Sequence, residues 1–205
     1  MADTIVGLFR FCAFVLIDTP FENESWMEGE LVMPLGTSNA TAPARHLRAT
    51  AKLPSAEERL KELGIELPSP PTPFGSYAEA VRSGNLLFVS GMLPTEGHTA
   101  KFVGRAGAEF DVETGRQAAR LAALNGLAVA RQYLGSLDRI TRIVRLGVSL
   151  ATTEDCREHP KVADGASDLL QEIFGRDKNP CRLINGVVSL PLGTPVALEL
   201  IFEVA

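Results

Sequence analysis

Hydrophobic and polar residues recur with different periods after about residue 54, and each period predicts a kind of element. Residues 111–135 are dense in alanine and leucine. Asp111 can cap the first turn and Gly135 can end the last one, so this stretch predicts the clearest helix of the chain. Its broad face of small apolar side chains indicates close packing on a sheet. A second helix is predicted over roughly residues 161–174.

Strand patterns flank these helices. The stretch "SYAEAVRSGNLLFVSG" predicts a hairpin, with a strand ending at residue 82, a turn at 83–85 and a strand over 86–90. The stretch "VRLGVSL" predicts a strand between the helices, and the last part of the sequence predicts a closing hairpin of strands 182–190 and 196–204. The order β-β-α-β-α-β-β predicts an α+β fold, in which two main helices cover one face of a mixed β-sheet.

The first part of the chain lacks such periods. An apolar run near its start is interrupted by Arg10, is too short for a membrane span, and lacks the basic residues that precede a signal-peptide core. Its role is open. Residues 21–52 show no sustained period, which predicts a poorly ordered arm. We expect an N-terminal extension over 1–53 and one folded domain over 54–205, beginning with a short helix that Ser55 caps and Gly64 ends.

Charge and composition narrow the classes of partner. The net charge is −5, from 20 Lys and Arg against 25 Asp and Glu, with no basic run. Nucleic-acid binding needs a clustered basic surface, so we expect no nucleic-acid partner. A hydrophobic content of 45% suits a soluble protein, which we expect to be cytoplasmic and without a membrane partner. Three cysteines and three histidines are scattered without the spacing of a zinc site, so we expect no metal or cofactor.

Two stretches resemble the signatures of one protein family. "GSYAEAVRSGNLLFVSGMLP" resembles a Gly-x-Tyr segment followed by a strand that ends in Ser-Gly-x-x-Pro. "PCRLINGVVSLPLGTPVALELIFEV" resembles a C-terminal signature of arginine, short strand, Leu-Pro, glycine and a strand with glutamate. Over roughly residues 55–205 the chain is similar to the RidA family, also called YjgF or endoribonuclease L-PSP. "ERLKELGIELP" and "KVADGASDLL" resemble a longer subgroup whose activity is less settled.

The resemblance implies a fold, an assembly and a reaction. The fold is a chorismate-mutase-like subunit, and the assembly is a homotrimer with a cleft between each pair of subunits. Well-understood members of the family hydrolyse reactive enamine or imine intermediates, such as 2-aminoacrylate, to a 2-keto acid and ammonia. The expected partner is therefore a small metabolite that carries a carboxylate.

The resemblance also implies the residues of the cleft. Arg182 would hold the substrate carboxylate through two parallel N–H···O bonds; the alternative is a solvated arginine at a strand end. Tyr77 would supply an apolar wall and a hydrogen bond, and Ser90 and Gly91 would bring backbone close to the ligand. The alternatives are an ordinary strand aromatic and a simple turn. Asp168 falls where many members place an asparagine.

The sequence departs from the family pattern on its final strand. Deaminating members present two glutamates at alternate positions, and here these positions hold Ala197 and Glu199. Alanine cannot transfer the proton of an attacking water. Glu199 faces the same side about 7 Å further along the strand, so it could act through a water or only hold a subunit contact. Ile184 replaces a frequent cysteine, and Cys181 is out of phase with that position, which favours a packing role.

Three functions follow from these observations. The leading hypothesis is a homotrimeric hydrolase acting on the C=N bond of 2-imino acids, with Arg182 and Glu199 as the catalytic candidates. The second is a non-catalytic trimer that binds or senses small carboxylates, which the alanine at 197 favours. The third is a ribonuclease. The acidic balance, the lack of a basic stretch and the lack of a histidine pair argue against it.

Overall fold

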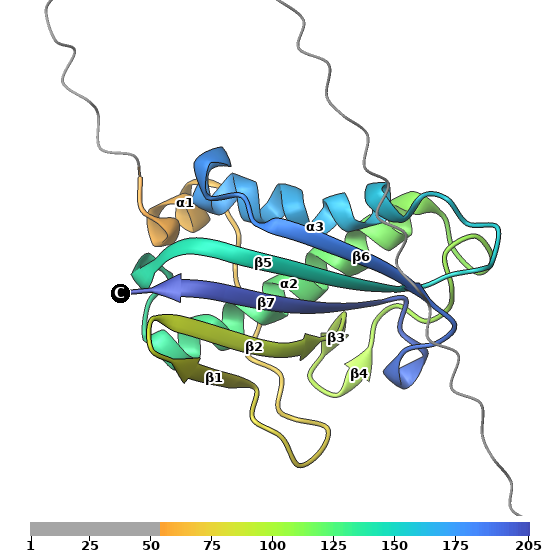
Figure 1. Ribbon diagram of the computed structural model, residues 1–205, viewed down its shortest axis with the longest axis horizontal. Coiled ribbons are helices and arrows are strands. Elements are labelled where there is room, and N and C mark those ends of the chain that lie inside the picture. The colour runs from red at the N-terminus through yellow and green to blue at the C-terminus, as the bar shows by residue number, and fades with distance from the viewer. Residues whose placement is uncertain (1–53) are drawn as a thin grey trace, which may run out of the picture. The chain divides into compact units, whose positions relative to one another are not determined.

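Five strands form one mixed sheet in the order β1-β2-β7-β5-β6 (Figure 1). The computed structural model describes residues 54–205. All neighbouring strands are antiparallel except β5 and β6, which are parallel. A separate two-stranded ribbon joins β3 (Thr95–Glu96) to β4 (Thr99–Ala100). The strands of the main sheet are β1 (Ala80–Ser83), β2 (Leu86–Met92), β5 (Ile140–Ala151), β6 (Cys181–Val187) and β7 (Val196–Val204).

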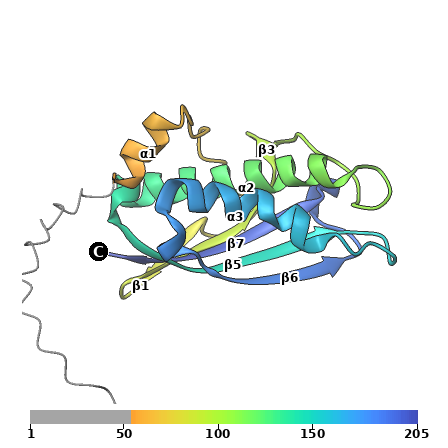
Figure 2. The ribbon, with the colours of Figure 1, turned by 90° about the horizontal axis from the view of Figure 1, so that it is seen from above.

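Two long helices cover one face of this sheet (Figure 2). They are α2 (Val112–Leu134) and α3 (His159–Phe174). The predicted ends of α2 are confirmed, because the Asp111 side chain accepts a hydrogen bond from the Thr114 N–H and Gly135 is left-handed, with φ 83°. The α+β class and the order of the elements are confirmed as well. The short helix α1 (Ala56–Glu62) begins with the predicted cap, in which Ser55 and Glu58 form a reciprocal capping box.

The predicted closing hairpin is wrong. β6 and β7 are not partners, because β5 lies between them, parallel to β6 and antiparallel to β7. Two strands with a short connection are typical of a hairpin, but the burial of each strand shows which one lies at the edge of the sheet. Every second residue of β7 is buried, which suits a central strand, whereas most of β6 is exposed, which suits an edge. The first hairpin is confirmed, with Ala80 opposite Val89.

Helices α2 and α3 approach each other closely at a glycine. A Cβ atom at Gly165 of α3 would overlap the backbone carbonyl oxygen of Arg116 on α2. Gly126 faces the sheet in a similar way, where a Cβ atom would lie 2.6 Å from Leu200 Cδ1. The small residues of α2 therefore act as predicted: they let the helices pack tightly on each other and on the strands.

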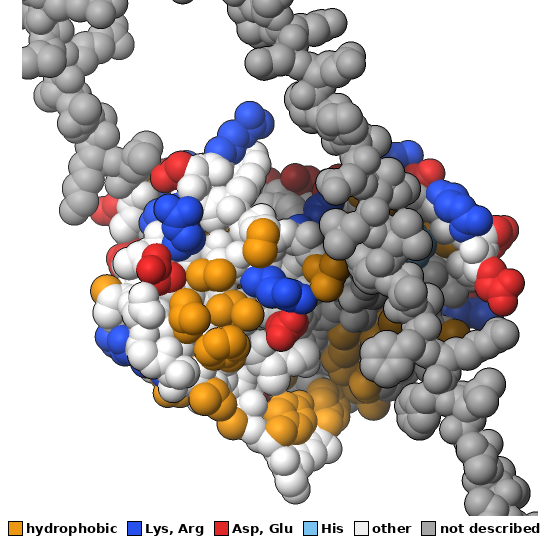
Figure 3. All heavy atoms as spheres, in the orientation of Figure 1, with side chains coloured by type: hydrophobic (Ala, Val, Ile, Leu, Met, Phe, Trp, Pro, Cys, Tyr) orange, Lys and Arg blue, Asp and Glu red, His pale blue; other side chains and the backbone are white. Residues whose placement is uncertain are grey.

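Within residues 54–205, no helix lies on the other face of the sheet. On β7 the predicted alternation is confirmed, since Leu198 and Leu200 point into the core and Ala197 and Glu199 point to the open face. Exposed apolar side chains gather over the open face, including Val81, Phe88 and Leu183 from three different strands (Figure 3). Such a patch is typical of a surface that another protein surface covers.

The predictions for the first part of the chain lie outside the described residues. They concern the extension over 1–53 and its apolar run. Within residues 54–205, no helix combines the length and the apolar character needed to cross a bilayer.

Candidate functional site

Arg182 lies on the edge strand β6 and points toward helix α3. Its Nη1 atom donates to Oδ1 of Asp164 at 2.7 Å and to Oγ of Ser167 at 2.9 Å. The side chain is 25% exposed, although the residue lies on a strand that is mostly exposed. Within residues 54–205, its Nε and Nη2 atoms make no hydrogen bond. One edge of the planar guanidinium is therefore held by the protein, and the other can receive a carboxylate.

Asp168 does not contact Arg182. Its Oδ2 atom accepts a hydrogen bond from Nη2 of Arg116 on α2 at 2.7 Å, and this bond raises the pKa of Arg116 above its usual value. Asp164 lies one helical turn earlier and is the acid that contacts Arg182. The sequence carried a signal for this, because residues four apart share one face of a helix.

Asp164 sets the charge around Arg182. A carboxylate beside the guanidinium cancels part of its positive charge, so an incoming anion meets a pair that is nearly neutral overall. The same ion pair, with Ser167, fixes the direction of the guanidinium plane. The ion pair therefore lowers the electrostatic affinity of Arg182 for an anion but holds its guanidinium in one orientation. This orientation favours a ligand that presents two oxygens in one plane.

Glu199 and Ala197 lie on the open face of the sheet, away from Arg182. The Oε2 atom of Glu199 is 3.6 Å from Nε of Arg145, so these side chains form an ion pair. Both glutamate and alanine line a hollow of about 140 Å³ on this face. Arg182 pairs with Leu146 on the neighbouring strand, so the two side chains lie on the same face of the sheet, and Leu146 faces the core. Arg182 therefore lies on the helix-covered face, whereas Glu199 lies on the open face.

Tyr77, Ser90 and Gly91 gather near β1 and β2. The Tyr77 hydroxyl accepts a hydrogen bond from the Phe74 N–H at 3.3 Å, and the ring is 46% exposed. Tyr77 and Gly91 line one small hollow. Ser90 Oγ is buried and has no hydrogen-bond partner in the part of the chain that the structure describes. An unpaired buried hydroxyl is costly, and a ligand or a neighbouring molecule could satisfy it.

Arg182 and the group of Tyr77, Ser90 and Gly91 lie at opposite sides of the sheet, and Gly91 also lines the hollow of Ala197 and Glu199. Strands β7 and β5 separate β2 from β6, which puts the strands of Ser90 and Arg182 about 14 Å apart at the usual strand spacing. A single small ligand cannot contact both groups within one chain. Each group can nevertheless bind part of a ligand: a carboxylate at Arg182, and a small polar group beside Tyr77 and Ser90.

A metal ion finds no ready site among these residues. No group of three or more His, Cys, Asp or Glu residues within 54–205 could hold one. Cys181 is exposed and its Sγ atom lies 3.1 Å from the Val144 carbonyl oxygen, so this thiol donates to backbone beside β5.

Comparison with known proteins places most of the described residues in one family. The model for the family described as "YjgF/chorismate mutase-like, putative endoribonuclease" matches residues 57–204. Protein TCP17 of Trypanosoma cruzi is 37% identical over 145 residues, which are 70% of this chain and 91% of that protein.

Two solved structures are similar in both sequence and fold. A "putative endoribonuclease" from Shewanella oneidensis is 38% identical, with a TM-score of 0.71, over 74% of this chain and all of that one. Atu1372 from Agrobacterium tumefaciens, a protein with unknown function, is 36% identical, with a TM-score of 0.66, over 73% of this chain and 92% of that one.

Proposed function

The chain belongs to the YjgF family, also called RidA, with its chorismate-mutase-like fold, and on that premise we propose that it hydrolyses 2-imino acids to 2-keto acids and ammonia. The observation that supports this most is the hydrogen bonding of the Arg182 guanidinium. One edge of its guanidinium is fixed by Asp164 and Ser167, and Nε and Nη2 have no hydrogen-bond partner within 54–205. That free edge matches the two oxygens of a substrate carboxylate.

The reaction needs little from the protein beyond position. Water adds to the carbon of the C=N bond, the nitrogen takes up a proton, and the resulting carbinolamine expels ammonia as its C–N bond breaks and a C=O bond forms. Arg182 would hold the carboxylate next to this carbon without changing its own protonation. Fixing the imine and the water in one geometry supplies much of the acceleration in such a step.

A complete cleft would need two copies of the chain. Because Arg182 and the Tyr77 group lie at opposite edges of the sheet, we propose a homotrimer in which the Arg182 edge of one subunit meets the Tyr77, Ser90 and Gly91 edge of the next. The exposed apolar side chains of the open face support an assembly that covers them. The partner of the site is then a small carboxylate lying between subunits.

A second candidate function is binding without turnover. Ala197 cannot act as an acid or a base, and Glu199, its nearest acidic neighbour on that strand, is already paired with Arg145 at 3.6 Å. This pairing favours a structural role for Glu199 on the open face over general-base catalysis. A protein that keeps Arg182 to bind a carboxylate, but has Ala197 where the catalytic acid would be, would bind 2-keto acids as a sensor or carrier.

The decisive experiment compares Arg182→Ala with Arg176→Ala on imino acids that an amino-acid oxidase generates in situ. Arg176 is an exposed arginine two residues after the end of α3, so its loss controls for the change in charge. We expect wild type and Arg176→Ala to accelerate semicarbazone-detected hydrolysis alike, and Arg182→Ala to lose about a hundredfold in rate, since it loses charge-assisted bonds.

Other outcomes separate the candidates. No acceleration by wild type, together with binding of 2-keto acids that Arg182→Ala abolishes, would establish the binding protein and exclude the hydrolase. RNA cleavage that survives purification and disappears in Arg182→Ala would instead support the ribonuclease named among the relatives.

A further inference from the structure

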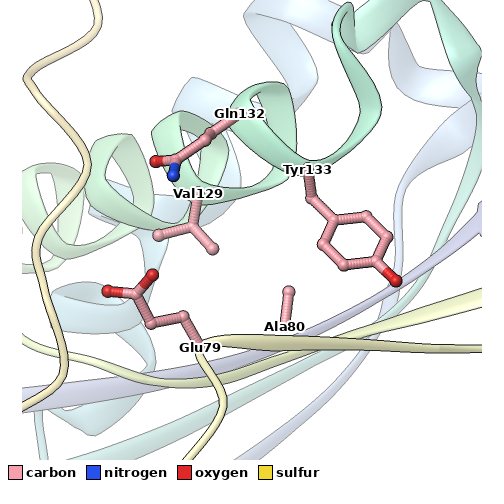
Figure 4. Close-up of a pocket in the computed structure, with 5 residues that line it drawn as sticks. All are labelled: Glu79, Ala80, Val129, Gln132 and Tyr133. Atoms are coloured by element: carbon pink, nitrogen blue, oxygen red, sulfur yellow. The ribbon is translucent and has the colours of Figure 1, made fainter.

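A pocket of about 310 Å³ lies between the start of β1 and the last turns of α2. Its lining is a carboxylate, an amide, an aromatic ring and two apolar side chains (Figure 4), supplied by Glu79, Ala80, Val129, Gln132 and Tyr133. The pocket lies at the opposite edge of the sheet from Arg182. Glu79 also lines the small hollow beside Tyr77 and Gly91, but the other four residues do not, and the proposed reaction gives this pocket no role.

Glu79 is the unusual member of this lining. Its Oε1 atom is buried and has no hydrogen-bond partner among the described residues. No Lys, Arg or His within residues 54–205 forms an ion pair with it. The residue is held in place through its backbone, because the Glu79 carbonyl accepts a hydrogen bond from the Ser90 N–H at 2.9 Å. A fixed carboxylate with a buried, unpaired oxygen is costly unless a donor reaches it.

The remaining walls complete a site for a positive charge. Figure 4 shows Gln132, Val129 and Glu79 on one side of the pocket, with Val129 between the other two, and the Tyr133 ring on the other side. The amide oxygen of Gln132 is a second acceptor, and an aromatic face attracts a cation electrostatically. Val129 and Ala80 provide an apolar floor.

We propose that this pocket binds a small primary ammonium ion with a short alkyl chain. The three N–H donors of the ammonium would reach the Glu79 carboxylate and the Gln132 amide oxygen, and the alkyl chain would lie on Val129 beside the Tyr133 ring. The pocket volume of about 310 Å³ leaves room for the ammonium group and its alkyl chain. An anion would be repelled by Glu79, and a metal ion would find a single carboxylate, where it needs several ligands.

The test is a calorimetric titration of the full chain with butylammonium chloride, with 1-butanol as the uncharged probe of the same shape. We expect saturable binding of butylammonium and none of 1-butanol. Glu79→Gln keeps the shape and removes the charge, so it should weaken butylammonium binding at least tenfold. Tyr133→Phe should retain binding and Tyr133→Ala should weaken it, because only the ring face is needed.

Two control variants make the test specific. Glu66→Gln removes an exposed carboxylate elsewhere and should bind as wild type does. Arg176→Ala removes an exposed arginine at the other end of the sheet order and should also bind normally. The proposal is overturned if wild type shows no saturable binding, if 1-butanol binds equally well, or if a folded Glu79→Gln protein, verified by circular dichroism, binds butylammonium as tightly as wild type.

Discussion

The guanidinium of Arg182 donates to Asp164 across the gap between β6 and α3, with 2.7 Å between Nη1 and Oδ1. This contact makes Asp164 a competitor for any anionic ligand as well as a support for the arginine. In Asp164→Asn the amide oxygen can still accept from Nη1, but the negative charge is gone. We expect affinity for 2-keto acids to rise about three- to tenfold, because a like charge near the ligand is removed.

Titration with pyruvate, followed by calorimetry, measures this effect, and Ser167→Ala serves as the control that removes a neutral partner of the same guanidinium. A drop in affinity in Asp164→Asn would show that the aspartate matters for orienting Arg182 more than it opposes the ligand.

Ala197→Glu tests whether the open face takes part in catalysis. The new carboxylate would stand on the face that carries Glu199, at the position of the first acid of deaminating family members. General-base catalysis typically contributes about a hundredfold or more. If a water bound near this face attacks the imine, we therefore expect the new carboxylate to raise kcat at least tenfold. Ala197→Gln is the matched variant without a base, and an equal kcat in both variants would contradict the prediction.

Phe88→Asp tests the proposed assembly. Phe88 is 39% exposed on the open face, and a carboxylate there would have to lose its water if another subunit covered it. We expect the variant to sediment as a monomer in analytical ultracentrifugation, and to lose imine hydrolysis with the assembly. Val103→Asp places the same charge on an exposed loop position and should leave the oligomer intact. An unchanged oligomer in Phe88→Asp would exclude the open face as the contact.

Gly165→Ala tests the close approach of α2 and α3. The added Cβ meets backbone of Arg116, which cannot move aside as a side chain could. We expect the free energy of unfolding to fall by about 2 kcal/mol or more, the cost of overpacking exceeding the gain in helix propensity. In Gly126→Ala the neighbour is the end of the Leu200 side chain, so the loss should be smaller. Urea denaturation measures both, and equal losses would contradict this explanation.

Local signals in the sequence predicted the helices and strands well, but predicted less well which strands pair with each other. Asp111 and Gly135 fixed the ends of α2 because capping depends only on residues a few positions apart. The partner of β6 could not be predicted in this way. It depends on which strands take the central positions of the sheet, and that is settled by packing across the whole sheet.

The candidate site shows the same division. The sequence predicts Arg182 as a site residue, and its alternation placed Glu199 and Ala197 on one face of β7. It could not show that Arg182 points to the opposite side of the sheet, because the phase of one strand relative to another is a tertiary property. The sequence did not single out Asp164, which contacts Arg182 one helical turn before Asp168, because that contact joins two elements distant in the sequence.

The position of β7 has a consequence for how the chain is made. β7 is the last of the five strands along the sequence, yet it lies in the middle of the sheet, between β2 and β5. While the ribosome synthesises the chain, β2 and β5 emerge first, and each exposes the edge that β7 will later fill. Unpaired strand edges invite wrong pairing between chains. We therefore expect the nascent chain to be open to wrong pairing until its final strand arrives, and chains cut short before residue 196 to aggregate.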